Sequence, residues 1–218
     1  MSHRATWRII RNILQTQKKK RKRKMEKYYF NEAQPRLTVG DGVVLLLING
    51  KQETEVMDGI PNENGMTTTD AVERKVWVYD GVRLETGGMT SEAALTAAAQ
   101  KMVLAEIEKL DTSSAVNGFM LNGERVWLDK ATRVGLMNST SIAKAMGQPT
   151  TTLWLGDVKL VVDCDKAIQL LSALEMYALE CFNVTAAHKK AVAEMSTVEE
   201  VLAYDYTAGY PEVLEMRI

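Results

Sequence analysis

The sequence predicts an α+β fold in which β-hairpins alternate with helices, and three observations lead to this prediction. Short apolar runs flank Asn-Gly and Asp-Gly pairs, which are typical of hairpin turns. Segments with helical apolar spacing and capping residues follow several of these runs. Residues 119–144 and 153–178 also align without a gap at an offset of 34 positions. We therefore expect a duplicated ββα unit followed by C-terminal helices.

Upstream of the repeat, the apolar run 43–48 predicts a buried strand. Asn49-Gly50 is a type I′ turn signal, so we expect residues 51–57 to return as the partner strand. Residues 58–70 are rich in glycine, proline and asparagine, which predicts a loop. A second hairpin is expected over residues 76–85, around Asp80-Gly81.

The next segment carries helix signals. Thr90 is a suitable N-cap, and the alanine-rich stretch 93–110 has apolar residues at helical spacing. The polar residues 111–117 predict a linker that leads into the repeat.

Each copy of the repeat predicts a tight hairpin, then a capping aspartate, then a helix. The aligned pairs are Leu121 with Leu155, Val126 with Leu160, Leu128 with Val162, Asp129 with Asp163, Val134 with Ile168 and Leu136 with Leu170. The first helix should end near Met146, before Gly147 and Pro149. Each copy is expected to bury a face that the other copy needs.

The second helix should run from Asp163 to about Phe182 and be interrupted at residues 183–185. Thr185 would then cap a further helix that ends at Met195. Ser196 and Glu199 form a capping-box pair that predicts a short last helix to Tyr204. The tail, residues 205–218, should be extended.

Charge divides the chain into unequal parts. Residues 1–24 hold ten of the 27 lysines and arginines and no acidic residue, whereas the remainder has 17 basic and 28 acidic residues, a net charge of −11. An acidic body is a poor match for nucleic acid and suits a basic protein partner. We therefore divide the chain into a basic leader (1–24), an α+β segment (25–115) and a ββα-repeat domain (118–218).

The leader leaves three interpretations open. Its apolar residues fall on one side of a helix, followed by the basic run 18–24, which fits an arm for nucleic acid or an anionic membrane surface. A disordered tail without a specific partner is the second interpretation. The third is that translation begins at Met25, where the charge changes.

No catalytic, cofactor-binding or metal-binding constellation stands out in the sequence. Two histidines, with Cys164 and Cys181 at no metal-binding spacing, make no zinc set. His188 has no evident orienting carboxylate or nucleophile, which argues against a general base. The longest apolar run is too short to cross a bilayer. We therefore expect a non-enzymatic protein without a cofactor, metal site or transmembrane segment.

The stretch from Asn122 to Pro211 resembles an uncharacterised domain family that is abundant in phages and prophages, in the version found in Bacteroides-type prophages. The most specific motifs are Ala-His-Lys-Lys-Ala-Val (187–192) and Ala-Tyr-Asp-Tyr-Thr-Ala-Gly-Tyr-Pro (203–211). The segments 123–133, 152–156 and 174–185 also match. The resemblance covers about 90 of the 218 residues and excludes the leader.

Members of that family usually sit among tail genes, often beside fibre genes. The resemblance therefore implies a tail accessory protein, either a tail-fibre assembly chaperone or a small structural piece, whose partner is a fibre or baseplate subunit. The expected location is the cytoplasm of the bacterial host or the virion tail. Nucleic acid is an expected partner only through residues 1–24, and a homo-oligomer is compatible with the sequence.

Two sets of aromatic residues are candidates for partner binding. The first is the C-terminal motif, with Tyr204, Asp205, Tyr206, Tyr210 and Pro211. The alternative for this motif is that the tail folds back onto the final helices and closes the core. The second set is Trp127 and Trp154, one in each repeat hairpin; they either pack between hairpin and helix or serve an adhesin-like module as exposed ligand platforms.

Overall fold

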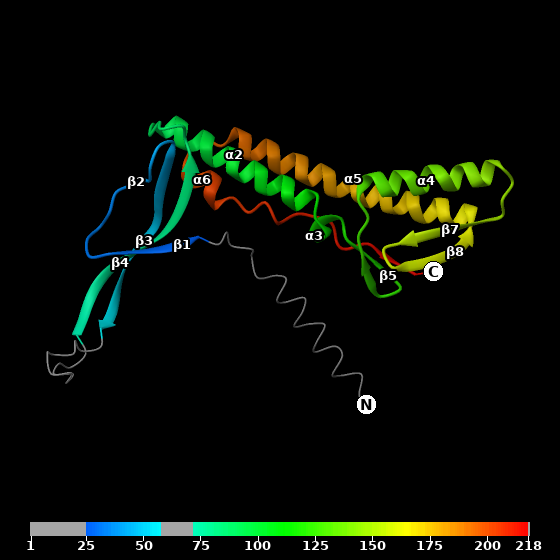
Figure 1. Cartoon of the computed structure of the whole chain (residues 1–218), viewed down its shortest axis with the longest axis horizontal. Helices are drawn as coiled ribbons and strands as arrows, with labels where there is room; N and C mark the ends of the chain where they lie inside the picture. The colour runs from blue at the N-terminus through cyan, green and yellow to red at the C-terminus, as the bar shows by residue number, and fades with distance from the viewer. Residues whose placement is uncertain (1–24, 58–71, 218) are drawn as a thin grey trace, which may run out of the picture. The chain divides into compact units, whose positions relative to one another are not determined.

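The computed structural model describes residues 25–57 and 72–217 (Figure 1). These residues form two compact units, which divide within one helix, between Ala98 and Ala99. The sequence-based division lay between residues 115 and 118 instead. The leader (1–24) and the whole of the loop expected at 58–70 fall outside the described residues.

The first unit contains a four-stranded antiparallel sheet in the order β1-β4-β3-β2. Its strands are β1 (Glu26–Phe30), β2 (Leu37–Thr38), β3 (Val43–Met57) and β4 (Val72–Glu85). The apolar run 43–48 lies in β3, as predicted. The buried side chains come mainly from β3 and β4: Val44, Leu45, Leu46, Val76, Val78, Tyr79, Val82 and Leu84.

The two hairpins expected at Asn49-Gly50 and Asp80-Gly81 are wrong, because both pairs lie inside continuous strands. Ile48 pairs with Asp80 and Lys51 with Val78, so Asn49 and Gly50 together oppose Tyr79 in a β-bulge. Asn49 takes a φ of 54°, as the turn signal requires, yet the chain continues in the same direction.

Tyrosine rings that pack against the backbone explain why two strand positions of this sheet are glycine. A Cβ at Gly50 would lie 2.3 Å from the Tyr79 ring, and a Cβ at Gly81 would lie 2.2 Å from the Tyr28 ring. Tyr28 and Tyr79 are paired across β1 and β4. Glycine is needed at these two positions because an aromatic ring covers the backbone there, and no turn is made.

The second unit contains most of α2 (Glu92–Asp111), then α3 (Ser114–Asn117) and the repeat. The first repeat copy is β5 (Phe119–Leu121), β6 (Glu124–Val126) and α4 (Lys130–Ala145). The second copy is β7 (Thr150–Leu155), β8 (Val158–Asp163) and α5 (Cys164–Glu194). The chain ends with α6 (Val198–Ala203) and β9 (Glu215–Met216). The prediction of an α+β fold is confirmed.

The repeat has the predicted local structure in both copies. Each hairpin is antiparallel, and Asp129 and Asp163 both accept hydrogen bonds from backbone N–H groups in the first turn of the helix that follows. Leu121 and its equivalent Leu155 are both buried in one core. That core also contains Leu128 and its equivalent Val162, so the two copies share the apolar faces that they bury.

Helices α4 and α5 pack side by side and antiparallel (Figure 1). Near the start of α4, the buried Arg133 donates to Glu175 Oε1 at 2.8 Å and to the carbonyl of Leu128 at 2.8 Å. At the other end, Lys144 pairs with Asp165. A buried guanidinium is stable only with such partners.

Four local predictions need correction. Residues 111–117 are not only a linker, because they include α3, and the N-cap of α2 is Ser91 rather than Thr90. The capping box is made by Thr197 and Glu200, one residue beyond the predicted pair. The break at residues 183–185 is absent, because α5 is continuous over 31 residues.

Candidate functional site

A cluster of polar side chains in the second unit lies where α2 runs antiparallel to the C-terminal half of α5. Lys189 of α5 pairs with Glu108 of α2. Further along, the Gln100 amide donates to the carbonyls of Val192, Ala193 and Met195, at 3.1, 3.2 and 2.9 Å. The last carbonyls of a helix have no partner within the helix, so Gln100 caps α5 from a neighbouring element.

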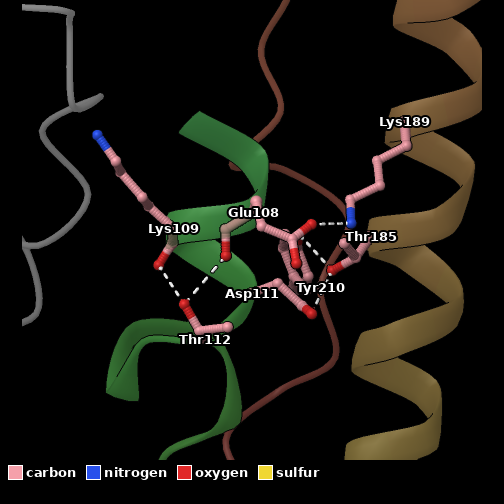
Figure 2. Close-up of polar contacts among 7 residues, drawn as sticks. All are labelled: Glu108, Lys109, Asp111, Thr112, Thr185, Lys189 and Tyr210. Atoms are coloured by element: carbon pink, nitrogen blue, oxygen red, sulfur yellow. Dashed lines mark hydrogen bonds and ion pairs between the residues drawn. The ribbon is translucent and has the colours of Figure 1, made fainter. Parts of the chain in front are cut away.

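Thr185 connects three segments of the chain in this cluster (Figure 2). Its side chain is 1% exposed, and its hydroxyl donates to Asp111 Oδ1 at 2.8 Å. The Tyr210 hydroxyl lies 3.0 Å from Thr185 Oγ1. Because Thr185 has one hydroxyl hydrogen and gives it to the carboxylate, Tyr210 is the donor to Thr185. The tail, α5 and α2 are thus joined by one chain of hydrogen bonds.

Figure 2 also shows how Thr112 caps the C-terminal end of α2, next to these hydrogen bonds. The Thr112 hydroxyl donates to the carbonyls of Glu108 and Lys109 at 3.1 and 3.3 Å. Burial raises the pKa of Tyr210, which therefore stays protonated and able to donate at neutral pH.

His188, one turn further along α5, contacts two of the tyrosines that were predicted to bind a partner. Its Nε2 lies 2.9 Å from the Ala208 carbonyl, which can only accept, so Nε2 carries a hydrogen. In the neutral ring, Nδ1 then accepts from the Tyr204 hydroxyl at 2.7 Å. The rings of Tyr204 and Tyr210 both lie 5.6 Å from the imidazole, measured between centroids. Both ring nitrogens of His188 are thus used inside the fold.

The remaining residues of the C-terminal motif also contact their own unit. The Tyr206 hydroxyl donates to Glu106 Oε2 at 2.8 Å, and Asp205 accepts from the backbone and hydroxyl of Thr207 at 3.0 and 2.6 Å. Pro211 is half-buried. Beyond it, β9 pairs in parallel with β5. The arrangement is the one expected if the tail closes the core.

Trp154 lies on the outer, solvent-exposed face of the β7–β8 hairpin, unlike the tyrosines of the tail, which bond within the fold. Trp154 is 56% exposed and is paired across the strands with Lys159, whose Nζ lies 5.9 Å from the ring centroid. Val161 and Thr152 are exposed and form the next pair on the same face. Trp127, directly after β6, is less exposed, at 39%.

Comparison with known families shows what part of the chain is similar to. A family model described as a domain of unknown function (DUF4376) matches residues 96–208, which is more than half of the chain. The chain belongs to the DUF4376 family. No curated protein and no solved structure matches it.

The DUF4376 match begins inside α2 and ends in the tail, so it follows the second unit closely. It includes Thr185, His188 and Trp154, whereas Tyr210 and Pro211 lie just beyond it. Sequence reasoning missed Lys159 and Val161 as neighbours of Trp154. Counting pairs outward from the two-residue turn at Gly156-Asp157 would have found both.

Within residues 25–57 and 72–217, no group of three or more His, Cys, Asp or Glu side chains is placed to hold a metal ion. Cys164 and Cys181 are buried free thiols, and burial raises the pKa of Cys181. None of the helices in these residues is both long and apolar enough to span a membrane.

Proposed function

We propose that this DUF4376 protein is a non-enzymatic component of a phage or prophage tail and binds another tail protein, either a fibre or a baseplate subunit. It would act as a tail-fibre assembly chaperone or as a small structural piece, in the host cytoplasm or in the virion tail. The motifs at 187–192 and 203–211 support the tail context.

The single observation that carries this proposal is the outer face of β7–β8. This face exposes Trp154 and Val161, while the inner face of the same hairpin contributes Leu153, Leu155 and Val162 to the core. A large aromatic side chain on a rigid support is the kind of residue that dominates binding energy in protein interfaces. The tail tyrosines use their hydroxyls within the fold, so Trp154 is the stronger binding candidate.

The proposal is tested by pull-down from phage-producing cells, read by mass spectrometry. We expect wild-type protein to recover a fibre or baseplate subunit and Trp154→Gln to recover much less. Ile142→Gln, which changes an exposed apolar residue on α4, is the matched control and should recover as much as wild type. Recovery of neither subunit by the wild-type protein would contradict the proposal.

A ligand-binding, adhesin-like module is the second candidate, and the exposure of Trp154 favours it. A sugar ring stacked on the indole would lie beside Lys159. Quenching of tryptophan fluorescence by added glycans, lost in Trp154→Gln but kept in Trp127→Gln, would support this function over protein binding.

A further inference from the structure

The first strand of each repeat copy has an outer edge, on the side away from its hairpin partner. In the first copy, β9 pairs in parallel with this edge of β5. Met120 N–H donates to the Leu214 carbonyl at 2.8 Å. Asn122 N–H donates to the Met216 carbonyl at 2.9 Å. The Leu214 and Met216 side chains pack against the core, whereas Glu215 between them is exposed. An extended segment of the pattern apolar-acidic-apolar therefore covers this edge.

The equivalent edge of the second copy carries no third strand in the part of the chain that the structure describes, where β7 pairs with β8 alone. The offset of 34 residues places Trp154 of β7 at the position of Met120 and Gly156 at the position of Asn122. Both hairpins have two-residue turns, and both turns begin at a positive φ, 49° at Asn122 and 65° at Gly156. The two edges thus have the same strand and turn register.

The backbone groups on the outer edge of β7 point away from β8. The pair of residues that flanks the two-residue turn Gly156-Asp157 is hydrogen-bonded, so the next pair, Trp154 with Lys159, is a non-hydrogen-bonded pair. The Trp154 N–H consequently points outward, as the Met120 N–H does towards β9. Thr152 and Trp154 are both exposed. An exposed strand edge of this kind can accept an extended segment as a further strand.

Charge and stoichiometry indicate which segment fits this edge. The exposed Lys159 has its Nζ over the Trp154 ring, 5.9 Å from the centroid. An acidic side chain at the outer position of an added strand, where β9 has Glu215, would lie beside this ring and attract the ammonium group. Each chain has two equivalent edges and one β9, which its own β5 holds. The tails of further copies therefore cannot fill both edges, and the occupant that we assign is a segment of a different protein.

We infer that the outer edge of β7 binds an extended segment of a partner protein as an added parallel strand, with an acidic residue beside Trp154 and an apolar residue on either side of it. The inference rests on the proposed function, because it names the mode by which the partner of the β7–β8 face binds. The main chain of β7 supplies the hydrogen bonds, and the indole ring covers the outer side of the added strand.

The first test uses a synthetic peptide of residues 212–217, Glu-Val-Leu-Glu-Met-Arg, which contains β9. Amide hydrogen exchange of the full chain, read by NMR, reports where the peptide pairs. An excess of peptide should slow exchange of the Trp154 and Gly156 amides at least tenfold, while the Lys159 amide on the β8 edge stays fast. A peptide with serine at both apolar positions of the pattern should protect neither. Fast exchange at Trp154 and Gly156 in excess peptide overturns the inference.

Exchange in the free protein tests the identity of the occupant. The Trp154 and Gly156 amides should exchange fast at every protein concentration. Exchange that slows as the protein concentration rises would show two copies paired through β7, and would overturn the assignment to a different protein.

Two proline variants form a matched pair. Thr152 and Val161 face each other across the hairpin, and both direct their N–H groups outward. Proline at either position therefore leaves the hydrogen bonds of the hairpin in place. Thr152→Pro should abolish the protection of Trp154 by the peptide, whereas Val161→Pro should keep it. Protection that persists in Thr152→Pro, or is lost in Val161→Pro alone, overturns the inference.

Failure of this inference is distinguishable from failure of the proposed function. If the pull-down recovers no tail subunit but the peptide protects the Trp154 amide, the tail function fails and the strand-binding edge stands. If a fibre or baseplate subunit is recovered but the Trp154 amide stays fast with the peptide, the tail function stands and strand addition at β7 fails.

Discussion

At the scale of single residues, hydrogen bonds between distant segments can override the structure that the local sequence predicts. Asn183, Val184 and Thr185 are poor helix formers, and the sequence alone predicts a break there. The helix continues because the Thr185 hydroxyl is buried between Asp111 and Tyr210. Both partners come from segments far away in the sequence, so no local pattern contains this information.

Replacing Thr185 with valine tests this contact. Valine keeps the shape but leaves the Tyr210 hydroxyl and one oxygen of Asp111 without their partner, so unfolding free energy should fall by about 2 kcal/mol. Urea denaturation measures the change. Thr152→Val, on the exposed face of β7, is the control and should change stability by less than about 0.5 kcal/mol. Equal effects at the two positions would mean that the buried hydrogen bonds contribute nothing.

At the scale of elements, the repeat is the part of the fold that sequence predicts best. Its signals are local: two-residue turns, alternating apolar residues and an aspartate before each helix. The strand boundaries in the first unit were missed for the opposite reason. Asn49-Gly50 and Asp80-Gly81 have the composition of turns, and only the Tyr28 and Tyr79 rings packed against the glycines reveal them as strand positions.

The cap at Asp129 makes helix α4 sensitive to acid. Hydrogen bonds from the backbone and hydroxyl of Thr132 hold the pKa of Asp129 below its ordinary value of 3.8. A carboxyl whose pKa is lower in the folded state stabilises the protein above its ordinary pKa. That stability is lost as the pH falls through the lowered value.

Urea denaturation midpoints between pH 7 and pH 3 should therefore fall more steeply for wild type than for Asp129→Asn, which keeps a capping oxygen but no titratable group. Asp157→Asn, in the β7–β8 turn, is the control and should keep the wild-type slope. Identical slopes for wild type and Asp129→Asn would show that the cap is not a source of the acid sensitivity.

At the scale of the whole molecule, the tail belongs to the second unit as fully as the helices do. Tyr204, Tyr206 and Tyr210 are tied to His188, Glu106 and Thr185. Leu214 and Met216 pack against the core, and β9 adds a parallel strand to β5. The sequence indicated the aromatic content of the tail but left its role open between a partner anchor and a closure of the core.

Deleting residues 205–218 separates those roles. Loss of the Leu214 and Met216 contacts removes about 3 kcal/mol of apolar burial, which lowers the melting temperature by about 10 °C. Tyr210→Phe, which removes one hydroxyl and keeps the tail, should lower it by a few degrees only. Differential scanning calorimetry reports both changes. An unchanged melting temperature together with lost partner binding would instead support the alternative that the tail anchors a partner.

The boundary between the two units differs according to whether it is placed from the sequence composition or from the packing of the structure. The sequence places the start of the repeat domain at residue 118, after a polar stretch, whereas the compact unit and the family match both begin within α2. A fragment of residues 118–218 lacks Gln100, Glu108 and Asp111, so the end of α5, Lys189 and Thr185 lose their partners. We expect this fragment to melt without cooperativity by circular dichroism. A fragment of residues 88–218, which keeps all of α2 and its Ser91 cap, should unfold in one cooperative transition. Cooperative folding of the shorter fragment would show that α2 is dispensable for the repeat.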